Sequence, residues 1–276
     1  MIGVTHYSSP GCRAVVAILA VIILSGCSKT GTPARSTDRQ GTRAPKATAA
    51  LPVGAPLKFL YRFQKGSMGW EADFADYPLA QTDTQFDSGI RPLPPELHAG
   101  ASAYYVQGNN ERNYDLFMYV RRRLGPTDGI KENQPYLVAY RISLASNAAN
   151  DCLPTVGSPG ESVFLKAGAA PRMPVSVLKD GTYRLNVDKG EVNMGGKHAS
   201  LVGTIANGLA CRDFSSPAVV PYASITRAHK HPMPVRSNDK GELWLLVGSE
   251  SAYGALTALY FEQIEVELTP VSSDGH

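Results

Sequence analysis

The stretch Tyr136-Leu-Val-Ala-Tyr-Arg-Ile-Ser-Leu144 decides the fold class of this 276-residue chain. Its bulky side chains occupy every second position, and smaller or more polar side chains lie between them. Because successive side chains of a β-strand point to opposite faces, this alternation predicts a strand with one buried face.

The same period of two recurs at residues 57–63 and 264–268. Further short apolar runs, bounded by Gly, Pro, Asn and Asp, lie at 103–107, 115–122, 163–166, 175–178, 182–187, 200–205 and 242–247. Lys179-Asp180-Gly181 separates two of them and predicts a hairpin turn. We find no convincing amphipathic helix longer than two turns. The pattern predicts an all-β chain folded as one antiparallel β-sandwich over residues 55–270, with a disordered tail at 271–276.

The N-terminus has the parts of an export signal. Arg13 precedes the uncharged run 14–24, which is too short to span a bilayer and has the length of a signal-peptide core. The run ends in Leu24-Ser-Gly-Cys27, which resembles the lipobox of bacterial lipoproteins. The resemblance implies removal of residues 1–26, a lipid on Cys27 and anchoring to a membrane. Ser28 in place of Asp implies passage to the outer membrane, facing the periplasm or the cell surface.

Residues 27–54 contain the lipidated Cys and few large apolar side chains, which predicts a flexible tether. The tether carries much of the positive charge. Arg13 and five tether cations leave 21 of the 27 basic residues and 23 of the 24 acidic residues for 55–276, a net charge of about −2. A nucleic-acid-binding domain needs a basic face of its own, so we expect no nucleic-acid partner.

The four cysteines are consistent with export from the cytoplasm. Cys12 leaves with the signal and Cys27 carries the lipid, which leaves Cys152 and Cys211. In an oxidising compartment two such residues form a disulfide by default, and no C-x-x-C spacing points to metal instead.

Three segments of the domain resemble strands of galactose-binding-like jelly rolls, the fold of many carbohydrate-binding modules. They are 59–70, which ends in Gly69-Trp70, the strand 135–144, and the final run 258–266. The whole chain also resembles a group of uncharacterised bacterial lipoproteins and secreted proteins that share the segments 69–78 and 157–168. The resemblance implies a jelly roll that binds a carbohydrate or another envelope component.

Many such jelly rolls hold a structural Ca²⁺ between their first and last strands. The corresponding residues here are Gln64, Glu262 and Gln263, which supply one carboxylate and two amides. Ca²⁺ takes six to eight oxygen ligands, so we predict no cofactor, and a structural Ca²⁺ stays open.

The motifs of common catalytic sites are missing from the sequence. It contains no G-x-S-x-G, no H-E-x-x-H and no G-x-x-x-x-G-K-[ST], and we predict no catalytic residue. His229-Lys230-His231 would place two imidazoles on one face of a strand, within reach of one metal ion. No third ligand is near in the sequence, and we favour a solvated loop there; the metal stays unknown.

Polar and aromatic residues cluster where the predicted strands end. Amides and carboxylates beside aromatic rings suit sugar hydroxyls, so the candidate ligand-binding residues are Trp70, Asp73, Asp76, Tyr77, Asn109, Asn147 and Glu161. Two alternatives stay open: a glycan-acting hydrolase that uses the loop carboxylates, and a structural envelope lipoprotein with a protein partner.

Overall fold

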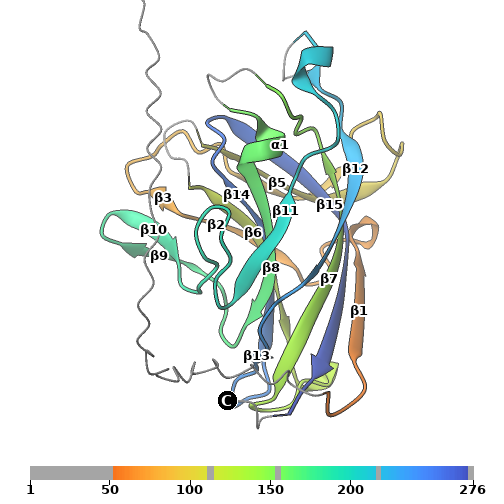
Figure 1. The fold of residues 1–276 in the computed structure, drawn as a ribbon, viewed down its shortest axis with the longest axis vertical. Coiled ribbons are helices and arrows are strands. Elements are labelled where there is room, and N and C mark those ends of the chain that lie inside the picture. The colour runs from red at the N-terminus through yellow and green to blue at the C-terminus, as the bar shows by residue number, and fades with distance from the viewer. Residues whose placement is uncertain (1–51, 111–114, 153–156, 216–218, 273–276) are drawn as a thin grey trace, which may run out of the picture. The chain divides into compact units, whose positions relative to one another are not determined.

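A computed structural model describes residues 52–110, 115–152, 157–215 and 219–272, which belong to one compact unit (Figure 1). Cys27, the signal 1–26 and nearly all of the tether 27–54 lie outside the described residues. Two large antiparallel sheets and one small sheet form the unit.

The first large sheet has seven strands. Its central order is β12-β7-β15-β5-β4, with β1 also paired to β15 and β13 also paired to β7. The strands are β1 (Leu57–Arg62), β4 (Asp87–Pro92), β5 (Ser102–Asn109), β7 (Pro135–Ser146), β12 (Ala223–Lys230), β13 (Val235–Arg236) and β15 (Leu256–Pro270).

The second large sheet has the order β11-β8-β14-β6-β2, and the small sheet has the order β3-β10-β9. The strands of the second sheet are β2 (Glu71–Ala75), β6 (Phe117–Leu124), β8 (Val163–Ala170), β11 (Ala199–Thr204) and β14 (Leu243–Ser251). Those of the small sheet are β3 (Tyr77–Pro78), β9 (Ser176–Lys179) and β10 (Thr182–Leu185). Short helical turns lie at η1 (Phe63–Lys65), η2 (Pro126–Asp128), α1 (Pro159–Ser162) and η3 (Cys211–Asp213).

The strand order defines a jelly roll. Eight strands, β5, β6, β7, β8, β11, β12, β14 and β15, are divided between the sheets as β5-β15-β7-β12 and β6-β14-β8-β11. In chain order these are strands 1-8-3-6 facing strands 2-7-4-5, which is the arrangement of two interlocked Greek keys. The predicted all-β antiparallel sandwich is therefore confirmed.

The core fills the space between the two large sheets. The central strand β7 places Tyr136, Val138, Tyr140, Ile142 and Leu144 inward, each at most 3% exposed, as its alternation predicts. The Tyr140 hydroxyl donates a hydrogen bond to the Gly168 carbonyl of the opposite sheet at 2.6 Å. A buried hydroxyl thus keeps a partner and ties the two layers together.

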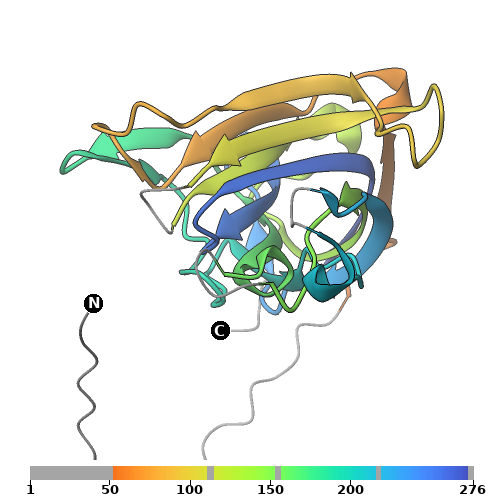
Figure 2. The same ribbon diagram turned by 90° about the horizontal axis from the view of Figure 1, so that it is seen from above.

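The hairpin β9–β10 projects from one side of the sandwich (Figures 1 and 2). Its turn residues Asp180 and Gly181 have φ values of 50° and 74°. Two consecutive left-handed residues suit a tight hairpin turn, and Asp-Gly tolerates that geometry. The turn predicted at residues 179–181 is confirmed.

Several sequence predictions differ from the structure. Strands β2, β4 and β12 were not predicted, and β12 contains His229, so the solvated loop expected at 229–231 is wrong. The burial of β12 alternates along its length, but its inward set includes Arg227 and His229, which hid the strand period. Val271 is 1% exposed and bridges Pro52, so the fold extends slightly beyond 55–270 at both ends.

The predicted disulfide is present. Cys152 and Cys211 are joined with their Cα atoms 4.8 Å apart, and they pack with Ala149, Val220 and Phe214. The bridge ties the segment after β7 to η3, at the end of the sandwich where α1 also lies (Figure 1).

Replacing both Cys152 and Cys211 by Ser should lower the free energy of unfolding by about 4 kcal/mol, because the bridge closes a loop with a sequence separation of 59. Urea denaturation of the double variant beside the wild type measures the difference. Equal midpoints for the two proteins, with the bridge verified in the wild type by peptide mass, would contradict this stabilising role.

Candidate functional site

Four buried charged side chains form a chain of ion pairs on the outer face of the second sheet. Lys166 of β8 is 0% exposed and Glu250 of β14 is 2% exposed, and their Nζ and Oε2 atoms are 2.5 Å apart. Lys189 Nζ lies 2.6 Å from Glu250 Oε1 and 3.0 Å from Asp76 Oδ2. Two cations thus alternate with two anions, which offsets the cost of burying each charge. We call Lys166, Glu250, Lys189 and Asp76 the charge cluster.

Backbone groups of the loop 188–197 complete the charge cluster. The Lys166 ammonium donates to the Lys189 carbonyl at 3.1 Å and to the Met194 carbonyl at 2.9 Å. The Val192 amide donates to Glu250 Oε1 at 2.9 Å. Burial lowers the pKa of Lys166, and the hydrogen bond and charge of Glu250 oppose that effect. The loop therefore folds around side chains that the sheet presents.

The ends of this loop are held together by Asp188. Its carboxylate accepts from the Gly190 amide and the Lys197 amide, both at 2.9 Å, and these bonds hold the pKa of Asp188 below its usual value. Gly196 is needed where the two ends of the loop meet, because a Cβ there would lie 2.0 Å from Asp188 Oδ1. The loop has a defined conformation although it contains no regular strand.

Asp76 connects the charge cluster to the hairpin. Its φ of 60° turns the chain between β2 and β3, and its amide donates to the Tyr183 carbonyl of β10 at 2.6 Å. Its carboxylate also lies 3.6 Å from Arg184 Nη1. The hairpin is thus tied to the sandwich by a backbone bond and an ion pair at one residue.

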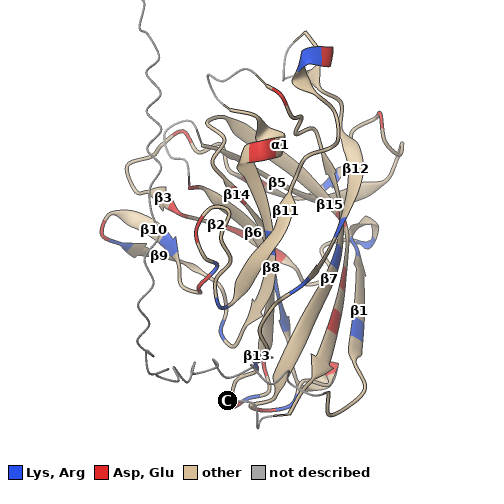
Figure 3. Ribbon diagram, in the orientation of Figure 1, with Lys and Arg blue, Asp and Glu red and all other residues tan. Residues whose placement is uncertain are grey.

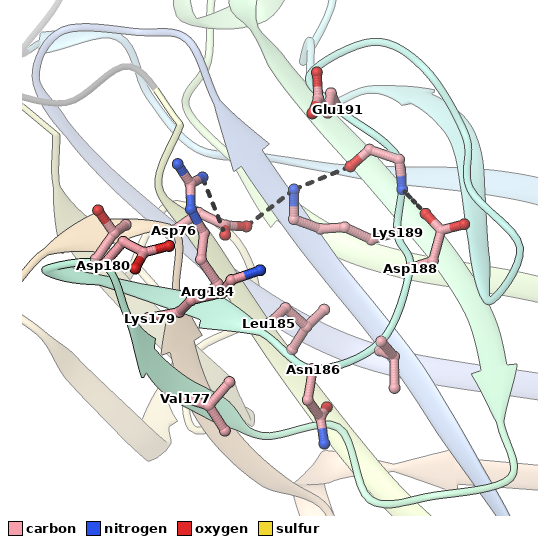
Figure 4. Close-up of a pocket in the computed structure, with 13 residues that line it drawn as sticks. Asp76, Val177, Lys179, Asp180, Arg184, Leu185, Asn186, Asp188, Lys189 and Glu191 are labelled. Carbon is pink, nitrogen blue, oxygen red and sulfur yellow. Dashed lines mark hydrogen bonds and ion pairs between the residues drawn. The ribbon is translucent and has the colours of Figure 1, made fainter.

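An open pocket lies between the hairpin and the loop 188–191, with a volume of about 670 Å³ (Figure 4). This size is within the range of small-ligand sites. Figure 4 shows Asp76, Lys189 and Arg184 joined by contacts along one wall, and Figure 3 shows charges of both signs on the hairpin. The lining includes Asp76, Lys179, Asp180, Thr182, Arg184, Asn186, Asp188, Lys189 and Glu191. Anionic, cationic and amide groups alternate in it, so it offers donors and acceptors without one dominant charge.

A row of four half-buried rings lies on the other side of the hairpin. Phe74 stacks on Phe86 at 4.2 Å, Phe86 meets Tyr77 edge-on at 4.9 Å, and Tyr77 stacks on Tyr183 at 4.9 Å between centroids. Tyr183 alternates along β10 with Thr182 and Arg184, which line the pocket. We call these four residues the aromatic row; it lies on the face of β10 opposite to the side chains that line the pocket.

The structure brings only part of the predicted ligand-binding set to this site. Asp76 and Tyr77 lie there, and Asp73 stands nearby with its carboxylate 3.0 Å from the Tyr119 hydroxyl and 2.9 Å from Arg121 Nη1. Trp70 is 1% exposed and packs edge-on against Tyr61 at 5.5 Å between centroids. The prediction that Trp70 contacts a ligand at the surface is therefore wrong, because its ring is part of the core.

Three other predicted residues lie elsewhere. Asn109 is 1% exposed and its side chain donates to the Asp83 carbonyl at 3.3 Å, which is a structural role. Asn147 is half-buried in the segment after β7. Glu161 is exposed in α1 and accepts from the Asp151 amide at 3.4 Å, beside the disulfide. In Figure 1, α1 lies at the end of the sandwich, away from the β9–β10 hairpin.

The residues proposed for a Ca²⁺ site differ in their surroundings, and Glu262 Oε1 is buried with no hydrogen-bond partner among the described residues. Gln263 accepts from Arg62 Nε at 3.1 Å and donates to Glu265 Oε1 at 2.7 Å, and Gln64 is exposed. Within the described ranges, no group of three or more His, Cys, Asp or Glu side chains is arranged to hold a metal ion.

Sequence reasoning missed Lys166, Glu250, Lys189 and Arg184. A signal was available for the first two, since each is a charged residue inside a run that otherwise reads as a buried strand. A Lys or Glu in such a strand is almost always paired. The sequence does not say with which residue, because the partners come from three separate segments.

Comparison with known proteins gives only distant structural likenesses. No family model matches the chain, and no curated protein sequence matches it. The enzymatically active domain of the bacteriophage CBA120 tailspike protein 4 is 7% identical, with a TM-score of 0.33, over 74% of this chain; the chain spans about 20% of that protein. The K3 cleaved adhesin domain of Lys-gingipain from Porphyromonas gingivalis is 11% identical, with a TM-score of 0.35, over 78% of this chain and 99% of that one. A carbohydrate-binding module described for specific mannan recognition is 8% identical, with a TM-score of 0.34, over 78% and 98%. Likeness at this level carries no information on a ligand of this chain, and membership of the lipoprotein group stays a prediction.

Replacing Glu250 by Gln should destabilise the fold by about 3–5 kcal/mol, because it leaves Lys166 and Lys189 buried without their shared anion. Glu267→Gln is the matched control. Glu267 pairs with Lys58 at 3.3 Å with side chains that are 44% and 72% exposed, so its loss should cost at most about 1 kcal/mol. Chemical denaturation of the two variants measures both losses in the free energy of unfolding. Equal losses would contradict the view that the buried charge cluster stabilises the fold more than an exposed ion pair does.

Proposed function

We propose that this protein is a membrane-anchored lipoprotein whose β-sandwich binds a carbohydrate of the cell envelope without cleaving it. One observation carries the proposal. The hairpin pocket presents fixed hydrogen-bonding groups of both signs, and the aromatic row lies on the opposite face of the same hairpin. Vicinal sugar hydroxyls both donate and accept hydrogen bonds, so they match the donors and acceptors of the pocket.

The contacts of the Asp76 and Asp73 carboxylates favour sugar binding over hydrolysis. A glycosidase needs one carboxylic acid and one carboxylate that face each other across the scissile bond. Asp76 lies 3.0 Å from Lys189 Nζ, and Asp73 lies 2.9 Å from Arg121 Nη1. Both carboxylates are thus engaged by cations of the fold, an arrangement that suits positioning of other groups better than attack across a scissile bond.

The anchor is proposed from the sequence, on Leu24-Ser-Gly-Cys27 and the apolar run before it. Two or more acyl chains on one Cys would hold the domain at a membrane, and the tether would let it reach envelope polymers. Among the residues that the structure describes, no helix is long and apolar enough to cross a bilayer.

A glycan array of neutral and acidic envelope polysaccharides, followed by titration of the best ligand, tests the binding site. Arg184→Ala should weaken binding at least tenfold, because it removes a pocket guanidinium worth about 1.5–3 kcal/mol per charged hydrogen bond. Arg141→Ala is the control, since the Arg141 side chain is 60% exposed against 52% for Arg184, and its ion pair with Glu265 on the first sheet is 3.9 Å long.

A second group of aromatic rings is an alternative binding surface, and binding there would contradict the hairpin site. Tyr260 contacts Tyr105 at 4.7 Å and Tyr222 at 5.3 Å between centroids, on the outer face of the first sheet. Loss of binding in Tyr260→Ala together with wild-type affinity in Arg184→Ala would place the ligand there and contradict the hairpin site. Absence of any glycan ligand would favour the protein-partner alternative.

Cys27→Ala should abolish lipid attachment and release the protein from the membrane fraction, because the acceptor thiol is gone. Membrane fractionation and intact mass measure both effects. Cys12→Ala is the matched control, because Cys12 lies within the segment expected to be removed. The Cys12→Ala protein should therefore still carry its lipid on Cys27. An acylated mature form from Cys27→Ala would disprove the anchor.

A further inference from the structure

A second cavity of about 690 Å³ lies where the edges of the two large sheets meet. Ser200 of β11, from the second sheet, and His229 of β12, from the first sheet, both line it. The other lining residues include Gly195, Lys197, Leu201, Lys230 and Met233. We call this cavity the edge groove; the loop 188–197 separates it from the hairpin pocket.

Ser200 is held between two imidazoles. Its Oγ atom lies 2.6 Å from His229 Nε2 and 2.8 Å from His231 Nδ1. His231 Nε2 lies 3.0 Å from the Lys197 carbonyl oxygen. Ser200 is 6% exposed and His231 is 2% exposed, so the groups are fixed by packing as well as by hydrogen bonds.

The Lys197 carbonyl oxygen can only accept a hydrogen bond, and this determines which atom of each group carries the proton. His231 Nε2 must donate to the Lys197 carbonyl, so the Nδ1 atom of neutral His231 is the acceptor. The Ser200 hydroxyl then donates to His231 Nδ1 and accepts from His229 Nε2. The serine proton therefore already points at a base whose tautomer is set by a third group, which is the arrangement of an activated nucleophile.

We propose that Ser200 is a nucleophile toward short-chain carboxylic esters, with His231 as its general base. This activity is separate from the proposed glycan binding and does not depend on it.

The reaction balances with water as the only co-reactant. Ser200 Oγ attacks the ester carbonyl carbon while its proton passes to His231 Nδ1, and the carbonyl π pair moves to oxygen. Collapse expels the alkoxide, which takes the proton from His231 and leaves an acyl group on Ser200. Water then attacks the acyl carbon by the same route, giving the carboxylic acid and restoring the hydroxyl.

The edge groove supplies the remaining features. His229 Nε2–H, which donates to Ser200 Oγ at 2.6 Å, is a donor beside the attacking atom that could stabilise the developing oxyanion. Leu201 and Met233 offer an apolar side for a short acyl chain, and Lys197 and Lys230 place positive charge beside it. Burial lowers the pKa of both His229 and His231, which keeps the base unprotonated near neutral pH.

A fluorophosphonate probe tests the nucleophile on the full chain at neutral pH. Attack by Ser200 Oγ on phosphorus forms a P–O bond and expels fluoride, so intact mass should show one adduct and peptide mapping should place it on Ser200. Ser200→Ala should lose both the adduct and release of nitrophenol from p-nitrophenyl acetate. Ser143→Ala is the control, since the Ser143 hydroxyl contacts Thr226 Oγ1 at 3.0 Å with no imidazole partner, and it should behave as the wild type.

His231→Gln should slow labelling at least about 100-fold, the range of general-base catalysis, with the fold checked by thermal unfolding. Absence of an adduct on the wild-type chain, an adduct on another residue, or labelling of His231→Gln at the wild-type rate would overturn the proposal and leave the three residues as a clamp between sheet edges. The wild-type peptide map decides the question even if Ser200→Ala does not fold.

Discussion

The ion pair between Lys166 and Glu250 is the constraint on which the candidate site depends. The two side chains leave adjacent strands on the outer face of the second sheet and are almost completely buried. Buried charges of this kind must have partners, and the partners here are Lys189, Asp76 and the backbone of residues 189–194. The loop and the hairpin are thereby held in one arrangement, together with the apolar packing of Leu185 and Val187 against the second sheet. The hairpin pocket is a consequence of that arrangement.

Much of the fold could be predicted from the sequence because the buried faces of the central strands are marked by strict alternation. The strand predicted at 136–144 is the middle of β7, and the predicted run 264–268 lies within β15. Strand β12 could not be predicted in this way, because its inward positions include Arg227 and His229. Arg227 donates hydrogen bonds to the carbonyls of Thr204 and Ala206, so its inward guanidinium links β12 to the end of β11. Such a bond is invisible in a one-dimensional pattern.

The candidate site could be predicted only in outline. Asp76 and Tyr77 were found because polar and aromatic residues gather where a strand ends, and that reason is a local one. Trp70 was misassigned because a Gly-Trp pair at a strand end reads equally well as an exposed platform or as a core anchor. Lys189 and Ser200 acquire their partners from other segments, and contacts of that kind depend on the topology of the two sheets.

The two cavities are linked by the loop 188–197. Asp188 lines both the hairpin pocket and the edge groove, and its carboxylate fixes the loop between them. The loop has no strand or helix of its own, and it is held by bonds to the charge cluster, to Asp188 and to His231. We expect these bonds to keep the loop as rigid as the strands beside it.

Hydrogen exchange of the backbone amides in the wild-type chain tests that claim directly. The amides of Gly190, Val192 and Lys197 each donate to a carboxylate, and we predict protection comparable to that of the neighbouring strands β8 and β14. Exchange of these three amides as fast as that of an open surface loop, with β8 and β14 still protected, would contradict the account.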